Sequence, residues 1–317
     1  MDEFGATPTG GFGVTDPTFL SPSRLATYAD CQRKYDHECE QEIETPDETR
    51  LYPNQGRVYH ETIEAVCEAT DPSDDPETVH RRAMDIFPEK WDEHEDEDEY
   101  ASRAHRKFQR AENRAAIDSF FDPEDGDGID HARRSIATEK WVECVHEGIG
   151  LHGKVDNVLY DESENELHLV DYKRTVGGVL GHWSGDRLVA HLDGEAHEAK
   201  RVKNAFQTAA YTEGIKQSDR YEEGTSVRFS FYGLLHDRDF EATPDGYRVS
   251  VTGKPRETTR AYEEYYDAIW ALAERAHRGI TDADYDPAPA SLIREEACPD
   301  CDYRAMCPEY LTEEVRR

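Results

Sequence analysis

The stretch that decides the fold is GKVDNVLYDESENELHLVDYK, residues 153–173. Apolar and polar residues alternate on both sides of its centre, as they do in β-strands that have one buried face. The acidic and polar residues 162–165 between the two alternating runs are typical of a turn. The sequence therefore predicts an antiparallel hairpin of two strands, 151–160 and 166–173.

The register of this hairpin decides which side chains meet. If Tyr160 pairs with Leu167, Asp156 lies directly opposite Asp171. Lys173 is two residues beyond Asp171 and shares its face. A slip of one residue would move Asp156 to the other face of the strand, so the prediction depends on the register.

Two directly opposed carboxylates repel one another, because their Cβ atoms lie about 4.5–5.5 Å apart. A cation between them removes the repulsion, and Mg²⁺ and Mn²⁺ prefer such oxygen ligands. A bound divalent ion can polarise a phosphate, and Lys173 would then orient the attacking water or offset developing charge. The alternative is that Asp156 and Asp171 are ordinary residues on an exposed face of a sheet.

The rest of the chain changes its hydrophobic period along its length. Residues 1 to about 20 are rich in Gly, Thr and Pro and predict a flexible tail, and the acidic run 92–99 predicts a solvated loop. A helical first half is followed by strands, a helix, two strands and a long helix, which indicates one α/β domain with a helical elaboration. We expect helices at 24–39, 56–69, 76–92, 100–121, 197–216 and 257–279, and strands at 137–146, 150–160, 166–173, 226–236 and 247–251.

The composition indicates a folded protein with a very acidic surface. The 317 residues carry a formal net charge of −33, with 10 Lys against 27 Arg. Such a surface suits very high intracellular salt, where the Debye length is about 3 Å and a DNA phosphate is not repelled far. We therefore expect a halophilic protein, for which acidity does not exclude nucleic acid. The sequence has neither an apolar stretch of about 18 residues nor a signal peptide, which predicts a cytoplasmic protein away from membranes.

Three of the seven cysteines lie close together near the end of the chain, in CPDCDYRAMC. Cys298, Cys301 and Cys307 follow the spacing C-x₂-C-x₅-C, which brings soft ligands around one metal centre. A fourth ligand must come from a distant segment, and Cys31 is the candidate, with Cys39 as the alternative.

At this point the sequence resembles a known group of enzymes. The pattern G-x-V-D, followed by a strand that ends in D-Y-K, is that of the PD-(D/E)XK nuclease superfamily, and particularly of its RecB-like branch. That branch also carries G-x-x-x-H on an earlier helix, which GRVYH at 56–60 matches, and Q-x-x-x-Y on a later helix, which QTAAY at 207–211 matches. The four blocks occur in the family's order and cover roughly residues 21–310.

The resemblance implies a role for each matched residue. It implies a restriction-endonuclease-like mixed sheet flanked by helices, and a site in which Asp156, Asp171 and Lys173 are catalytic. The metal ligands would be Asp156, Asp171, His60 and the carbonyl of Tyr172. On the later helix, Gln207 and Tyr211 lie one turn apart, support the site and touch DNA. Glu61 and Glu139 are further carboxylates near the site to which we assign no role.

The cysteines also match the resemblance. The segment SPSRLATYADCQRKY around Cys31 resembles the block that supplies the first of four cysteines in RecB-like nucleases of end-processing complexes and of CRISPR adaptation. In those proteins the four cysteines hold a [4Fe–4S] cluster, which implies that Cys31, Cys298, Cys301 and Cys307 do so here. Four cysteines also suit Zn²⁺, and the spacing alone does not choose between the two.

Together these observations predict a Mg²⁺- or Mn²⁺-dependent deoxyribonuclease. We expect a single domain at 21–317, with a helical part to about 130, a sheet core to about 280 and a Cys-rich segment at 281–317 that forms an iron–sulfur knot. The resemblance favours exonuclease action on single-stranded or end-containing DNA, in repair, recombination or CRISPR adaptation, with a helicase or an adaptation protein as partner. The alternative is a DNA-end-binding or complex-building subunit with little catalysis.

Overall fold

The computed structural model describes residues 18–45, 51–179, 181, 185–244 and 246–314. Apart from one short strand, helices occupy the described chain up to residue 134, and strands and helices follow in groups. In chain order the elements are β1 (Phe19–Leu20), α1 (Pro22–Asp30), α2 (Gln32–Tyr35), η1 (Asp36–Glu40), α3 (Leu51–Ala69), α4 (Pro76–His94), η2 (Glu97–Glu99), α5 (Arg103–Phe120), α6 (Asp127–Arg134), β2 (Ser135–His146), β3 (Ile149–Asp161), β4 (Glu166–Lys173), α7 (Gly185–Leu192), α8 (Ala199–Lys216), β5 (Ser226–Thr243), β6 (Gly246–Glu257), α9 (Thr259–Glu264), α10 (Tyr266–Thr281), α11 (Ala290–Glu296), η3 (Cys298–Asp300) and α12 (Pro308–Glu314).

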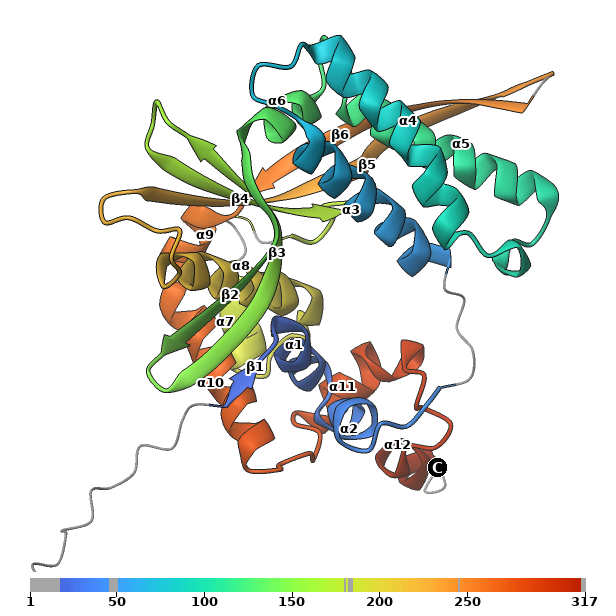
Figure 1. Ribbon diagram of the computed structural model, residues 1–317. Coiled ribbons are helices and arrows are strands. Elements are labelled where there is room, and N and C mark those ends of the chain that lie inside the picture. The colour runs from blue at the N-terminus through green and yellow to red at the C-terminus, as the bar shows by residue number, and fades with distance from the viewer. Residues whose placement is uncertain (1–17, 46–50, 180, 182–184, 245, 315–317) are drawn as a thin grey trace, which may run out of the picture.

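The strands form one six-stranded mixed sheet in the order β1-β3-β4-β5-β6, with β2 paired to the other side of β3. The β1–β3 and β4–β5 pairs are parallel, and the other neighbours are antiparallel. Figure 1 shows α3, α4, α5 and α6 gathered on one side of the sheet, with α8 and α10 on the other. The predicted mixed sheet flanked by helices is therefore confirmed.

The predicted hairpin register is also confirmed. Tyr160 pairs with Leu167 and Val158 with Leu169. The turn is fixed locally, because the carboxylate of Asp161 accepts hydrogen bonds from the amides that follow it. Asn165 closes the turn with a φ of 48°, which Asn tolerates better than most residues.

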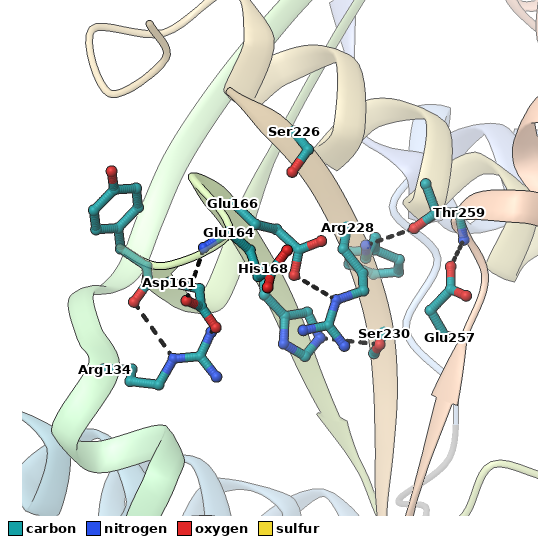
Figure 2. A network of polar contacts seen from close by, with 12 residues as sticks. Arg134, Asp161, Glu164, Glu166, His168, Ser226, Arg228, Ser230, Glu257 and Thr259 are labelled. Carbon is teal, nitrogen blue, oxygen red and sulfur yellow. Dashed lines mark hydrogen bonds and ion pairs between the residues drawn. The ribbon is translucent and has the colours of Figure 1, made fainter. Parts of the chain in front are cut away.

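Polar contacts hold the neighbouring strands in the same register (Figure 2). Arg228 on β5 forms an ion pair with Glu166 on β4 at 2.8 Å, and His168 hydrogen-bonds Ser230 at 3.0 Å. These contacts join β4 to β5, and the hairpin joins β4 to β3. The positions of the last residues of β4 are therefore fixed relative to both strands.

Alternate residues of β4 enter two different hydrophobic cores. Leu167 and Leu169 pack with the α8 and α10 side, whereas Val170 and Tyr172 pack with the side of α3 to α6. Because β4 is buried on both faces, the carboxylate of Asp171, which lies among these apolar residues, is removed from water.

Several expectations about local structure differ from the observed elements. The long helix predicted at 257–279 is divided at Tyr265 into α9 and α10. The helix predicted at 24–39 is interrupted at Cys31, whose backbone is extended with a φ of −161°. Of the tail predicted at 1–20, residues 1–17 lie outside the described residues, while Phe19 and Leu20 pair with β3 as β1. The loop predicted at 92–99 begins later, because α4 continues to His94.

The beginning and the end of the described chain lie side by side below the sheet, as Figure 1 shows for α1, α2, α11 and α12. The hydroxyl of Tyr28 donates to the carbonyl of Asp284 at 2.6 Å, and Tyr303 donates to the carbonyl of Ile43 at 3.2 Å. Among the helices of the described residues, none combines the length and the apolar character that crossing a membrane requires.

Candidate functional site

The two aspartates meet where β3 and β4 separate. The last described pair of this ladder is Asn157 with Val170, so Asp156 and Asp171 are the next residues toward the opening. There the amide of Tyr172 donates to Oδ2 of Asp156 at 2.7 Å. The Asp156 side chain thus accepts a bond that a ladder would give to a backbone carbonyl, which fixes its carboxylate beside β4.

Asp171 is the most constrained of the acidic groups. It is 2% exposed, its Oδ1 lies 2.6 Å from Nζ of Lys173, and its Oδ2 has no hydrogen-bond partner among the described residues. Burial, together with the nearby charge of Asp156, raises the pKa of Asp171 to about 6, against the opposing effects of Lys173 and His60. A buried carboxylate oxygen without a partner is costly, and a bound cation would satisfy it.

Lys173 is held by the same carboxylate. Burial alone would lower the pKa of its ammonium group, but the ion pair with Asp171 raises the pKa above its ordinary value. The ammonium also lies 5.6 Å from the centroid of the Phe231 ring. Lys173 is therefore a charged group with a fixed position at the end of β4.

His60 reaches the carboxylates from α3. Its Nδ1 lies 3.3 Å from Oδ2 of Asp156, and its ring meets the ring of Tyr172 edge to face. Burial lowers the pKa of His60, but the charge of Asp156 outweighs that effect and raises the pKa to about 9. The predicted proximity of His60 to the strand pair is thus observed.

Glu139 is the residue that the sequence did not assign. The pairs Thr138 with Asn157 and Lys140 with Val155 put Glu139 opposite Asp156 on β2. One ligand atom each of His60, Glu139 and Asp156 lie within 4.8 Å of one another. Glu139 adopts a φ of 48° inside a strand, a signal that only the structure reveals.

These groups border an open cleft of about 930 Å³ between α3 and the β2–β3 ribbon. Gly56 lies on its α3 wall, and a Cβ atom added there would meet nothing within 4 Å. The cleft is lined by Pro53, Gly56, Arg57, His60, Glu61, Glu64, Ala65, Glu68, Lys90, Glu139, Lys154 and Asp156.

Comparison with known proteins shows the family to which the chain belongs. Residues 19–308 match the sequence profile of the PD-(D/E)XK nuclease superfamily. The chain belongs to this superfamily. Among solved structures, a candidate exonuclease from Eubacterium rectale is 13% identical, with 85% of this chain and 83% of that chain covered at a TM-score of 0.45. No curated protein matches the chain.

The Q-x-x-x-Y block of this nuclease-superfamily chain lies on α8 and contacts the G-x-V-D block directly. A Cβ atom on Gly153 would lie 2.5 Å from the Tyr211 ring, so only glycine allows this packing. Burial, and then the charge of Asp171, raises the pKa of the Tyr211 phenol well above its usual range. The two blocks therefore form one packed unit behind the carboxylates.

Gln207 and Tyr211 are each 7% exposed. This burial suits their predicted role in supporting the site, but it leaves Tyr211 no free ring face on which a base could stack. Within the described part of the chain, Oε1 of Gln207 has no hydrogen-bond partner. Their contact with DNA remains a prediction.

The four cysteines of the predicted knot come together from the two ends of the chain. Burial raises the pKa of the Cys31 thiol to about 11, and the neighbouring Cys298 and Cys301 add to the effect. Cys307 likewise lies near Cys298. A cleft of about 910 Å³ borders Cys31, Cys298 and Cys307.

Cys39 has different surroundings. Burial raises its pKa, and the charged groups that follow in effect are Glu38, Arg24 and Glu40 rather than other cysteines. Cys31, and not Cys39, is therefore the fourth cysteine beside the C-terminal three.

Proposed function

We propose that this protein is a Mg²⁺- or Mn²⁺-dependent deoxyribonuclease whose centre consists of Asp156, Asp171 and Lys173. The observation that carries the proposal is the buried Oδ2 of Asp171, which has no hydrogen-bond partner among the described residues. The charge of Asp156 is near enough to help raise the pKa of this carboxyl group. Two adjacent carboxylates of this kind fit a hard divalent cation.

The proposed ligands are His60, Asp156, Asp171 and the carbonyl of Tyr172, to which we add Glu139. When bound, the ion polarises phosphate oxygens and lowers the pKa of the attacking water. The chain's own residues do the rest. Asp171 holds the ammonium of Lys173 at 2.6 Å, where it would orient the water or offset charge on the phosphate.

We propose that the substrate is DNA that is single-stranded or has a free end, and that the enzyme removes nucleotides from that end. This part rests on the resemblance to end-processing and CRISPR-adaptation nucleases, which also suggests repair, recombination or spacer acquisition as the setting and a helicase or adaptation protein as partner. The net charge of −33 fits action in the cytoplasm of a halophile, where salt screens the repulsion of DNA.

We also propose that Cys31, Cys298, Cys301 and Cys307 hold a [4Fe–4S] cluster rather than Zn²⁺. The choice of iron–sulfur over Zn²⁺ rests on the resemblance to nucleases whose four cysteines hold such a cluster, because four cysteines suit either metal. Protein purified without oxygen should show a broad absorption shoulder near about 400 nm, whereas a colourless protein with stoichiometric zinc would contradict this part of the proposal.

The deciding experiment is a cleavage assay of the full chain in molar KCl with Mn²⁺. Labelled single-stranded and duplex DNA would be compared for the wild type, Asp171→Ala and Lys173→Ala. We expect each variant to cleave at least about 100-fold more slowly, because each loses a group that acts on the reacting phosphate. Lys216→Ala is the matched control, since Lys216 lies on α8 and pairs with Glu213 instead.

Cleavage that persists unchanged in both variants would remove the proposed centre. If the wild type binds DNA ends tightly without cutting them, the protein is instead a DNA-end-binding subunit on a nuclease fold.

A further inference from the structure

The face of the β2–β3 ribbon that carries the carboxylates extends beyond them along both strands. Trp141 pairs with Lys154, and Glu143 pairs with His152. Since alternate residues share a face, these pairs follow Glu139 and Asp156 on one side of the ribbon, in steps of about 6.6–6.8 Å. The first step beyond the carboxylates is therefore the Trp141–Lys154 pair.

Trp141 lies on the exposed face of β2, together with Glu143 and Val145. Val142 and Cys144 point to the other face and are buried in the core on the α8 side, whereas 53% of Trp141 remains exposed. The indole is nevertheless held in position, because its ring meets the His152 ring edge to face at 5.1 Å and its Nε1 donates to Glu143 at 3.4 Å. Trp is enriched at binding interfaces, because it offers a large apolar ring together with a polar N–H.

Cations border the same surface from both walls of the cleft. Lys154, half of whose side chain is exposed, forms an ion pair with Glu139 and so connects Trp141 to the ligand cluster. Arg57 faces the cleft from α3, and no ion pair is recorded for it within the described ranges. The same face also carries the carboxylates of Glu139, Glu143 and Asp156. The Trp141 ring is therefore the main group that an unpaired base could contact, with Lys154 as the adjacent cation for a phosphate.

We infer that Trp141, together with His152 and Lys154, forms a binding strip for single-stranded DNA that leads to the carboxylate centre. The indole stacks on an unpaired base next to the scissile position, while Lys154 and Arg57 contact phosphates. Duplex DNA does not suit this surface, because the faces of its bases are covered by neighbouring base pairs. The inference rests on the proposed function and names the form of DNA that the site takes.

Binding is tested by fluorescence anisotropy with a fluorescein-labelled oligothymidine and with a blunt duplex of equal length. The protein is the full chain with Lys173→Ala, so that neither substrate is consumed during the measurement. We expect Trp141→Ala to weaken single-strand binding roughly 5- to 100-fold, the range found for the loss of one stacked base. Trp141→Phe should restore most of the affinity, and duplex affinity should change less than twofold.

Phe240→Ala is the matched control, because Phe240 is also a largely exposed aromatic residue, at 61%, but lies on the β5–β6 arm. It should leave the affinity for both DNA forms unchanged. In molar KCl, where charges are screened over about 3 Å, Lys154→Ala should weaken binding less than Trp141→Ala does.

Unchanged single-strand affinity in Trp141→Ala would overturn the inference, and so would an equal loss for the duplex. A change in oligomeric mass without a change in DNA affinity would mean that the strip is a protein interface instead. The outcome is separate from the cleavage assay: if Asp171→Ala cleaves like the wild type, the proposed centre fails even where Trp141 is needed for binding.

Discussion

The carboxylate centre and the cysteine segment both gather residues that are distant in the sequence, but different forces hold them. Asp156 and Asp171 are positioned by backbone ladders on either side of β3 and β4, and Asp171 is almost fully buried. The cysteines depend on side-chain contacts between the chain's two ends.

Arg33 is the main link in the cysteine segment. It pairs with Asp36, with Asp286 at 3.0 Å and with Glu309 at 2.8 Å. Asp286 is largely exposed, and a surface ion pair contributes little stability. The comparison teaches that the backbone ladders build the carboxylate centre, at a cost in charge repulsion, whereas the cysteine segment relies on side-chain contacts that the proposed metal would reinforce.

The sharpest break of this comparison is Asp171→Asn. We expect cleavage to fall at least about 100-fold, because the variant loses a charged ligand. The melting temperature of the metal-free protein at pH 7 should stay unchanged or rise, because the raised pKa of Asp171, about 6, shows that burial disfavours its charged form even beside Lys173. Cleavage rates and thermal melts in EDTA measure both, and a lower melting temperature would show that the charge stabilises the fold.

Cys31→Ser, in contrast to Asp171→Asn, should lower the stability of the protein. Loss of one of four ligands should release the bound metal and lower the free energy of unfolding by roughly 2 kcal/mol or more, because the two ends of the chain are no longer joined. Metal content and urea unfolding measure the effect. Cys39→Ser is the control. An equal loss of metal in that variant would show that Cys31 is not the distinguishing fourth ligand.

Glu139→Gln tests whether β2 contributes to the centre. The concentration of Mn²⁺ that gives half-maximal cleavage should rise about 10- to 100-fold, as for other groups that tune a metal site. Glu143→Gln, four residues further along β2 on the same face, should leave it unchanged. Equal behaviour of the two variants would remove Glu139 from the ligand set.

The smallest effect is on the pH dependence of stability without metal. The folded-state pKa of Asp171 is raised to about 6, so its contribution is full below about pH 4 and is lost as the pH rises through 6. His60, with a pKa of about 9, contributes fully below about pH 6.5 and loses this as the pH rises through 9. Urea unfolding in EDTA measures the difference in unfolding free energy between the wild type and Asp171→Asn, and between the wild type and His60→Ala. Each difference should decline once as the pH rises. A difference that grows in the opposite direction would contradict the assigned charges.

Much of the centre could be predicted from the sequence because it depends on local rules. Alternation along two strands and a polar turn predicted the hairpin. The assumed pairing of Tyr160 with Leu167, which the structure confirms, then put Asp156 opposite Asp171. The role of Glu139 could not be predicted in this way. Its position follows from the pairing of β2 with β3 and from a φ of 48°, and neither leaves a pattern in the neighbouring residues.

By itself, the sequence determined the hairpin, the order of helices and strands, and the spacing of the C-terminal cysteines, since each follows from periodicity or from residues close in the chain. Only the tertiary structure decided that Asp171 is buried, with no hydrogen-bond partner for its Oδ2 among the described residues. It also decided that Cys31 interrupts its helix near Cys298 and that Trp141 remains exposed beside the cleft. The reason is that burial and charge depend on which distant segments pack together. A local hydrophobic pattern gives the face of a strand, but not what covers it.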